Sequence, residues 1–254
     1  MKRFDSRIVF GLLLIVGGGL ALAQALGYLE NVSQYFWGAV FAIAGLAFLS
    51  LLFSGEWWSA FPGFTLLSLG VLILLPESLE DISGGLFLGG IAISFWYVYL
   101  TDRNGRWWAI IPGGVLTALS LLIFASSYFE EYSGAIVLGG IGLTFFVVYL
   151  TNATERWWAL IPAGVLTTLA AVTVVAEQVG EFQTAGVFFF GLAITFLLVA
   201  LLAKMRWAYW PALVLGIMGI LGVASLLDVA NYIWAIALIL AGGVMLFRYF
   251  TNRA

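Results

Sequence analysis

Carboxylates are the side chains of this sequence best suited to chemistry, and six of the 13 come in neighbouring groups. Glu80 is followed by Asp81 and Glu130 by Glu131, while Glu177 and Glu181 lie four residues apart. Carboxylate oxygens are the ligands that divalent cations such as Ca²⁺ prefer, so converging loops could hold a cation. The alternative is that these acids only keep one surface wet and fix the orientation of the chain. We favour the alternative and predict no metal site.

The residue types that are missing exclude several kinds of chemistry. The sequence has no histidine and no cysteine. Histidine-ligated haem or zinc and Ser-His or Cys-His nucleophiles are therefore excluded. The lysines, Lys2 and Lys204, flank apolar runs rather than lie inside them, so a retinal Schiff base in mid-membrane has no attachment point. We expect no catalytic residue and no cofactor.

The composition indicates that a bilayer is the main solvent of this chain. Hydrophobic residues make up 63% of the 254 residues and charged residues only 9%. A soluble globular domain carries about 25% charged residues, and polar surface is too scarce here to cover one. We therefore predict an all-α integral membrane protein, with the whole chain, 1–254, as one transmembrane domain.

Apolar segments of about 20 residues are long enough to cross a bilayer as helices. The basic start and apolar run of the N-terminus resemble a signal peptide, but the run continues to about Leu29 without a clear cleavage site, so we interpret it as the first span. The sequence predicts ten transmembrane helices at roughly 8–29, 33–54, 57–76, 82–101, 107–127, 132–151, 157–176, 183–203, 207–227 and 230–247.

The charges agree with ten spans. When the N-terminus is placed in the cytoplasm and the sides alternate, all ten basic residues fall on the cytoplasmic side. The opposite loops carry acids and no lysine or arginine. Basic residues near span ends resist translocation and so set orientation. Both termini are therefore expected in the cytoplasm.

A fifty-residue period runs through the chain. YLTDRNGRWWAIIP (99–112) returns as YLTNATERWWALIP (149–162), which is two spans and two short loops later. Each repeat is thus a helical hairpin that returns to its starting side, and such parallel repeats differ from the inverted repeats of many transporters. The sequence predicts five tandem hairpins at approximately 1–56, 57–106, 107–156, 157–206 and 207–254.

Tryptophan marks the cytoplasmic start of the four hairpins after the first. Its ring is apolar while its N–H needs a partner, so it favours the membrane interface. A proline follows within the first helical turns, where a missing N–H costs little. The alternative is a binding surface for a ligand or partner. We interpret the following residues as interface anchors: Trp57, Trp58, Trp107, Trp108, Trp157, Trp158, Trp207 and Trp210.

Glycine recurs on the second helix of the repeat. Small residues let helix backbones approach closely, which is how helices associate in lipid. The alternative is a groove for an acyl chain or a carotenoid. We assign helix packing to Gly85, Gly89, Gly90, Gly139 and Gly140.

Two stretches resemble the helices of small bacterial membrane proteins of the LiaI/LiaF type. These are FGLLLIVGGGLALAQALGYL (10–29) and WPALVLGIMGILGVASLL (210–227), in which leucine- and isoleucine-rich helices are punctuated by glycine. That family is tied to envelope-stress signalling and carries short hairpins. The resemblance implies a non-enzymatic protein of the prokaryotic cytoplasmic (inner) membrane that acts through partners. This chain departs from the family by having five hairpins and no soluble C-terminal domain.

The absence of ionisable side chains inside the predicted spans decides between function classes. Proton relays, ion pathways and coupled transport normally depend on such groups. We therefore expect a non-enzymatic scaffold or partner-binding subunit. Its partners would be membrane lipids and a second copy or another membrane protein, with no nucleic acid. The alternative is a pore or uncoupled carrier for small neutral or apolar solutes, and a lipid-modifying enzyme finds least support.

The charge pattern makes a testable prediction about topology. Because the native chain has no cysteine, single cysteines at Glu130 and at Asn104 report on one loop each. A membrane-impermeant thiol reagent added from outside should label Glu130→Cys and leave Asn104→Cys unlabelled until the membrane is permeabilised. The opposite labelling would contradict the topology.

Overall fold

The computed structural model describes residues 15, 17–19, 21–27, 32–126, 129–176, 178, 181–223, 238–239 and 242. These residues form helices and the turns between them, with no strand in the described part of the chain. Half of the predicted span 8–29 and most of the predicted span 230–247 lie outside the described residues. The chain divides into two compact units, Met1–Ser133 and Gly134–Ala254, and each is described by itself.

Long α-helices make up both units. The first unit contains α2 (Val32–Ser50), α3 (Ala60–Leu74), α4 (Glu80–Thr101) and α5 (Ile110–Ala125), and the second contains α6 (Ser133–Thr151), α7 (Leu160–Val175), α8 (Glu181–Leu202) and α9 (Tyr209–Val223). Short 3₁₀ segments adjoin them at Leu51–Ser54, Trp57–Ser59, Glu77–Leu79, Trp107–Ala109, Glu130–Tyr132, Trp157–Ala159 and Arg206–Ala208.

Within the described residues, eight helices are long and apolar enough to cross a membrane. They coincide with the eight predicted spans between 33–54 and 207–227, with ends that differ by a few residues. Four of them begin with a 3₁₀ turn that is followed by a proline, which is the third residue of the α-helix at Pro62, Pro112, Pro162 and Pro211. The proline lacks an N–H where an early helical residue has no intrahelical acceptor, so the turn is left intact. The chain is thus an all-helical protein with the character of an integral membrane protein.

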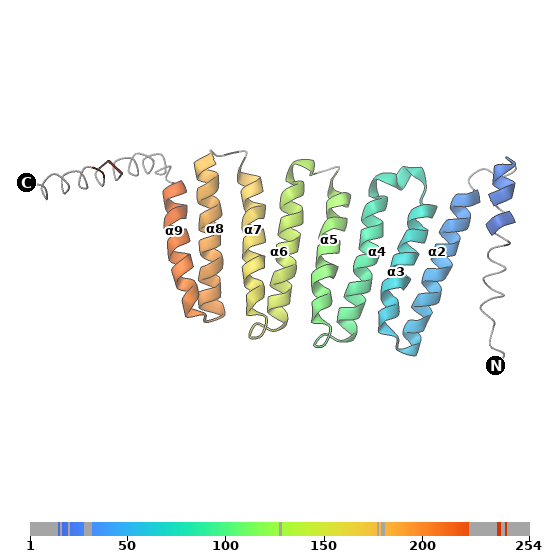
Figure 1. Cartoon of the computed structure of the whole chain (residues 1–254), viewed down its shortest axis with the longest axis horizontal. Coiled ribbons are helices and arrows are strands. Elements are labelled where there is room, and N and C mark those ends of the chain that lie inside the picture. The colour runs from blue at the N-terminus through green and yellow to red at the C-terminus, as the bar shows by residue number, and fades with distance from the viewer. Residues whose placement is uncertain are drawn as a thin grey trace, which may run out of the picture. The chain divides into compact units, whose positions relative to one another are not determined.

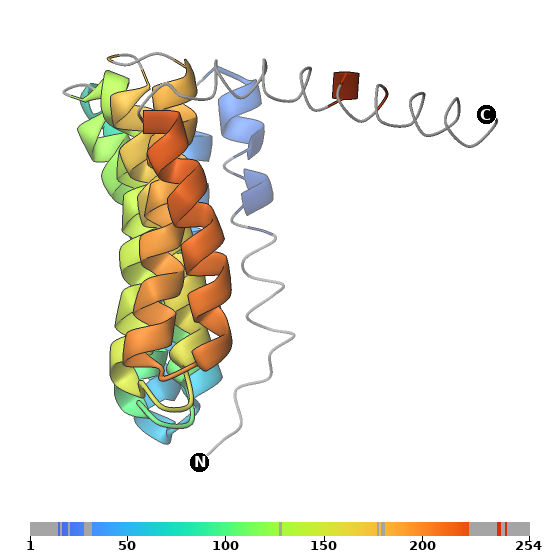
Figure 2. The ribbon, with the colours of Figure 1, turned by 90° about the vertical axis from the view of Figure 1, so that its left-hand side faces the viewer.

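The helices of each unit stand side by side in chain order, one helix thick (Figures 1 and 2). In the first unit the strongly packed pairs are α2 with α3, α3 with α4, and α4 with α5. In the second unit they include α7 with α8 and α8 with α9. Because each helix has neighbours only on its sides, no more than 33% of the residues of any span are buried. Two broad apolar faces therefore remain on each unit.

Backbone contact at glycine holds α2 against α3. A Cβ built on Gly45 would lie 2.5 Å from the Leu67 nitrogen, and one on Gly70 would lie 2.6 Å from the Ala42 nitrogen. Gly38 and Gly45 are seven residues apart on α2, as are Gly63 and Gly70 on α3. This spacing keeps the glycines on one seam when two helices cross at a small angle. Residues that bear a Cβ would push the two backbones apart.

The α8–α9 pair uses the same kind of contact. A Cβ on Gly219 would lie 2.7 Å from the Phe190 nitrogen, and one on Gly186 would overlap the backbone at Gly222 and Val223. Ala193 and Ala200, seven and fourteen residues after Gly186, are buried on the same helix. Small residues thus form the seams at which neighbouring helices meet.

Candidate functional site

Two loops that connect helices share one hydrogen-bonding pattern. In the α4–α5 loop, Asp102 Oδ1 accepts a hydrogen bond from the Gly105 N–H at 2.9 Å, and the Asp102 carbonyl accepts one from the Arg106 N–H at 2.9 Å. In the α6–α7 loop, Asn152 Oδ1 accepts from the Glu155 N–H at 3.2 Å, and the Asn152 carbonyl accepts from the Arg156 N–H at 2.9 Å. Asp and Asn are suited to this role because their short side chains reach a backbone N–H a few residues on.

The arginine of each loop turns back onto the helix that precedes it. Arg106 donates to the Thr101 hydroxyl at 3.0 Å, and Arg156 donates to the Thr151 hydroxyl. The repeated sequences T-D-R-N-G-R and T-N-A-T-E-R therefore specify the same loop. The Asp or Asn closes the turn, and the final arginine donates a hydrogen bond to the first threonine.

The α2–α3 and α8–α9 connections are tighter and use a left-handed residue instead. Gly55 has φ 86°, its N–H bonds the Leu52 carbonyl at 3.0 Å, and the Glu56 N–H bonds the Leu51 carbonyl at 3.3 Å. This is the Schellman arrangement that ends many helices. Lys204 takes the left-handed conformation (φ 57°) in the α8–α9 turn, which costs about 1–2 kcal/mol for a residue with a Cβ.

The first tryptophan of the pair packs into a cluster at the loop end of the first unit. Ala60, Val98 and Ala109 form its fully buried centre, and Trp57 packs against them. The Arg106 guanidinium carbon lies 4.3 Å from the centroid of the Trp57 ring, a cation–π contact. The cluster therefore joins the start of one hairpin, the end of its second helix and the start of the next hairpin.

A similar cluster occurs in the second unit. Its buried members include Leu160, Val199 and Ala208, and Trp157 and Met205 pack against it. Met205 directly precedes the 3₁₀ turn Arg206–Ala208, just as Arg106 precedes Trp107–Ala109. An apolar side chain thus stands at the position that carries arginine in the loops before it.

The second tryptophan is partly exposed and touches a phenylalanine ring with its buried side. Trp58, Trp108, Trp158 and Trp207 are 46%, 40%, 36% and 48% exposed. Trp207 occupies the second position of its 3₁₀ turn, so Arg206 stands where the other turns have their first tryptophan. Trp210, which is 73% exposed, is the second residue of α9 and is not part of a pair. The predicted anchors thus divide into packed first and exposed second tryptophans, with Trp210 apart from both.

The glycines assigned to helix packing contact neighbouring helices from both sides of α4. A Cβ on Gly85 would lie 3.2 Å from the Ser120 carbonyl oxygen, and one on Gly89 would lie 3.0 Å from the Ser120 hydroxyl, both on α5. A Cβ on Gly90 would overlap the Ser68 hydroxyl of α3. On α6, a Cβ on Gly139 would lie 3.7 Å from the Ala170 Cβ of α7, and the Gly140 carbonyl accepts a hydrogen bond from Thr144 at 2.9 Å.

A groove opens between α3, α4 and α5 of the first unit; we call it the α3–α5 groove. Its volume is about 590 Å³, within the range of about 300–1,000 Å³ in which small-molecule pockets fall. Its walls include Phe64, Leu86, Ile93 and Phe124, and its floor runs along Gly85, Gly89 and Gly90. The lining is almost entirely apolar, with a few hydroxyl groups and one indole.

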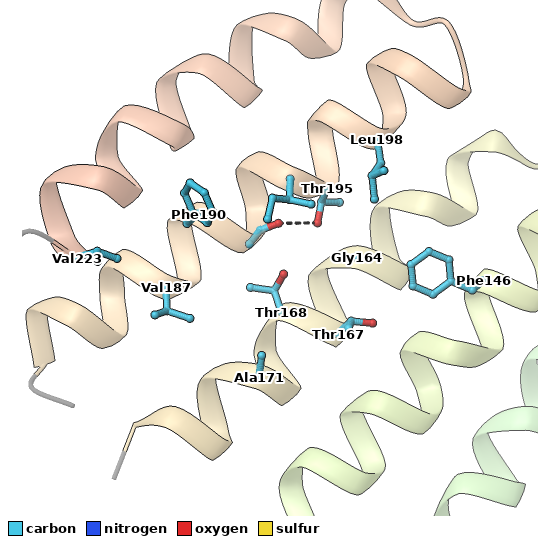
Figure 3. A pocket seen from close by; sticks show the side chains of 12 residues that line it. Phe146, Gly164, Thr167, Thr168, Ala171, Val187, Phe190, Thr195, Leu198 and Val223 are labelled. Carbon is cyan, nitrogen blue, oxygen red and sulfur yellow. Dashed lines mark hydrogen bonds between the residues drawn. The ribbon is translucent and has the colours of Figure 1, made fainter. Parts of the chain in front are cut away.

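A second groove lies on α7 and α8 of the second unit (Figure 3); we call it the α7–α8 groove. Its volume is about 360 Å³. Thr167, Thr168 and Gly164 line it from α7, while Phe190 and Thr195 line it from α8. The Thr195 hydroxyl donates to the Gly191 carbonyl at 2.9 Å, the bond drawn in Figure 3.

Hydroxyl groups within the spans are turned toward helix carbonyls. Thr117 donates to the Gly113 carbonyl at 2.7 Å, and Thr167 donates to the Ala163 carbonyl at 2.8 Å. Ser120 donates across the helix pair to the Gly85 carbonyl at 2.7 Å. In the described part of the chain, no buried side-chain nitrogen or oxygen lacks a hydrogen-bond partner. These groups therefore stabilise helices rather than offer free donors to a polar ligand.

The charged residues of each unit gather at the helix ends. Glu80 and Asp81 lie in the first turn of α4, where a helix N-terminus favours negative charge, and Arg103 and Arg106 lie at its other end. Glu181 lies in the first turn of α8, while Lys204 follows that helix. Among the described residues, no three of His, Cys, Asp or Glu come together as a metal site. Glu177 lies outside the described residues.

Sequence reasoning missed the glycine seams on α2–α3 and α8–α9 and the groove on α7 and α8. At Gly85, Gly89 and Gly90 it weighed a groove for an acyl chain but favoured helix packing. The seam on α2–α3 had a visible signal, because two glycines seven residues apart occur on each helix at Gly38/Gly45 and Gly63/Gly70. The hydroxyl residues of the grooves appear scattered in the sequence. Ser68 and Thr168, exactly one hundred residues apart, each face a glycine of the next helix, Gly90 and Gly191.

The contrast between the two tryptophans of a pair makes a testable prediction. Trp57→Ala removes a ring from a packed cluster and should lower the free energy of unfolding by about 2 kcal/mol, less than a fully buried tryptophan because the ring is half-buried. Trp58→Ala, its exposed neighbour, should cost less than about 1 kcal/mol. The measurement is reversible unfolding in mixed micelles. Equal losses from the two variants would show that both rings serve only as anchors.

Comparison with known proteins does not assign this chain to a family. No family model, curated protein or solved structure matches it. Its function therefore has to follow from the geometry of the described residues.

Proposed function

We propose that this chain is a non-enzymatic multi-pass membrane protein that acts as a structural scaffold or partner-binding subunit. In this proposal it has ten transmembrane helices in five tandem hairpins, with both termini in the cytoplasm. It works by packing against lipids and against a second copy or another membrane protein. Its location is the prokaryotic cytoplasmic membrane, as the LiaI/LiaF-type resemblance implies.

The observation that carries the proposal is the exposed apolar surface of helix layers one helix thick. Leu100 of α4 is 57% exposed, and Leu143 and Leu150 of α6 are 63% and 74% exposed. In lipid such faces associate through van der Waals contact with lipid chains or with another helix. Large exposed apolar patches mark membrane or protein interaction sites. A scaffold needs this kind of surface, whereas an enzyme needs a cluster of reactive groups.

The loop geometry supports the tandem-hairpin part of the proposal. The Asp102 and Asn152 turns repeat their hydrogen bonds after fifty residues, and Ala109 and Ala159 are fully buried at the same place in their 3₁₀ turns. Two hairpins that end in the same turn keep the same register with the hairpin that follows each of them. This favours parallel repeats in which the exposed faces recur.

The alternative is a carrier or pore for small neutral or apolar solutes. The two grooves favour it, because they are apolar spaces of ligand size. A path for polar solutes would need hydroxyls directed into a common channel. The span hydroxyls Thr117, Thr144, Thr167 and Thr195 instead bond carbonyls of their own helices.

Mass and flux measured on the same preparation separate the two functions. In nanodiscs the protein should have the mass of a defined homo-oligomer or of a complex with another membrane protein. Liposomes that contain it should release glycerol and short-chain alcohols no faster than protein-free liposomes. A lone monomer that accelerates release would favour the carrier.

A further inference from the structure

The two grooves are built from matching positions. Residues of α3 that line the α3–α5 groove match residues of α7, one hundred positions later, that line the α7–α8 groove. Lining residues of α4 and α8 match in the same way at a spacing of 101. The matching pairs are Phe64 and Gly164, Leu67 and Thr167, Ser68 and Thr168, Val71 and Ala171, Leu86 and Val187, Gly89 and Phe190, Gly90 and Gly191, and Ile93 and Ile194. The same kind of hollow thus forms independently in each unit.

One helix contact explains why the hollow forms. Ser68 of α3 faces Gly90 of α4, and Thr168 of α7 faces Gly191 of α8, at distances that leave no space for a Cβ on either glycine. The backbones of α3 and α4, and likewise of α7 and α8, therefore lie close together at this point. Gly85 and Gly89 extend the floor of the α3–α5 groove without side chains, while larger residues such as Phe64 and Ile93 stand at its sides.

The polar groups that line the α3–α5 groove are already paired. The Trp96 Nε1–H donates to the Thr117 hydroxyl at 3.0 Å, and that hydroxyl donates to the Gly113 carbonyl at 2.7 Å. Ser120 donates to the Gly85 carbonyl, and Ser68 donates to the Phe64 carbonyl of its own helix. A ligand with polar groups would find no free N–H or O–H here, so the occupant has to be apolar.

The size of the groove separates a hydrocarbon chain from a helix. A helix with side chains is about 10 Å across, so 590 Å³ would hold only about 7 Å of its length. A partner helix is thus too wide to lie inside the groove and would forfeit contacts with much of its lining. A flexible alkyl chain is slender enough to lie along the glycine floor. It is also the molecule that surrounds a transmembrane helix at the highest concentration.

We propose that the α3–α5 groove is a binding site for one alkyl chain of a membrane lipid. This inference rests on the proposed membrane-embedded function, and it adds a defined lipid position to it. The α7–α8 groove is the smaller counterpart, because Phe190 stands where the first groove has Gly89. The lipid chain fills the space that the glycines leave and stiffens the contact between α3, α4 and α5.

Photo-crosslinking in nanodiscs tests the site. The probe is a phosphatidylcholine with a diazirine on one acyl chain, and the readout is the crosslinked peptide identified by mass spectrometry. In the wild-type protein, crosslinks should be enriched on the groove-lining segments of α3, α4 and α5 over other apolar surfaces. Uniform labelling of all exposed apolar residues would overturn the proposal.

Two substitutions on α4 form a matched pair. Ile93 lines the groove and is 52% exposed, while Leu100 lies outside it and is 57% exposed. Ile93→Trp should fill the groove and reduce its crosslinks about tenfold, equivalent to about 1.4 kcal/mol of binding free energy. Leu100→Trp should leave them unchanged. Equal effects of the two variants would contradict a defined site.

Two further variants guard against a general loss of structure. Val71→Phe narrows the same groove from α3 and should give the same loss as Ile93→Trp. Phe190→Gly should raise crosslinking on α7 and α8, since it opens the smaller groove. The mass of the assembly is measured on each sample. If the assembly keeps its mass but no crosslinks form in the groove, the lipid site is rejected and the scaffold function is retained. If the assembly is lost but groove crosslinks form, the scaffold function is rejected and the lipid site is retained.

Discussion

Close backbone approach at small residues is the interaction on which the rest of this structure depends. Lipid chains are as apolar as leucine, so helices in a bilayer gain little from burying apolar side chains and associate mainly by packing. The chain meets this constraint with glycine: Gly45 and Gly70 leave no space for a Cβ between α2 and α3, and Gly219 does the same between α8 and α9. Where the glycine seam is less tight, as at Gly139 and Ala170, the facing residue is still small. Within each unit, neighbouring helices are thus joined along narrow lines of small residues.

Narrow seams have consequences for both faces of the layer. When the small residues of a helix face its neighbours, large apolar residues occupy its outer faces. On α4 and α6 these are exposed leucines and isoleucines. The grooves follow from the same cause, since a glycine that admits Ser68 at one point leaves a hollow beside it. Loop chemistry then fixes the ends. The Asp102 and Asn152 turns close the α4–α5 and α6–α7 loops, and the Trp57 and Trp157 rings pack into the buried clusters at the same helix ends.

Much of this fold could be predicted because its strongest signals are local. Length and apolarity gave the eight described spans, and the recurrence of Trp-Trp, proline and arginine at fifty residues gave the repeated loop. The 3₁₀ turn decides which tryptophan of a pair is packed and which is exposed, and the sequence alone does not show the geometry of that turn. For the same reason the sequence does not show that Trp207 stands second in its turn, as Trp58, Trp108 and Trp158 do. The grooves depend on which face of α4 meets Ser68 and Ser120, and only three-dimensional register decides that.

Disulfide trapping between α6 and α7 tests the central role of small-residue seams most directly. A Cβ on Gly139 would lie 3.7 Å from the Ala170 Cβ, close to the mean of about 3.8 Å found in disulfides. In the otherwise cysteine-free chain, Gly139→Cys with Ala170→Cys should oxidise rapidly and almost completely in native membranes. Leu143→Cys with Ala170→Cys, which pairs the same alanine position with a residue that is 63% exposed, should not. Oxidation of the Leu143 pair at the same rate as the Gly139 pair, or of neither, would contradict the seam.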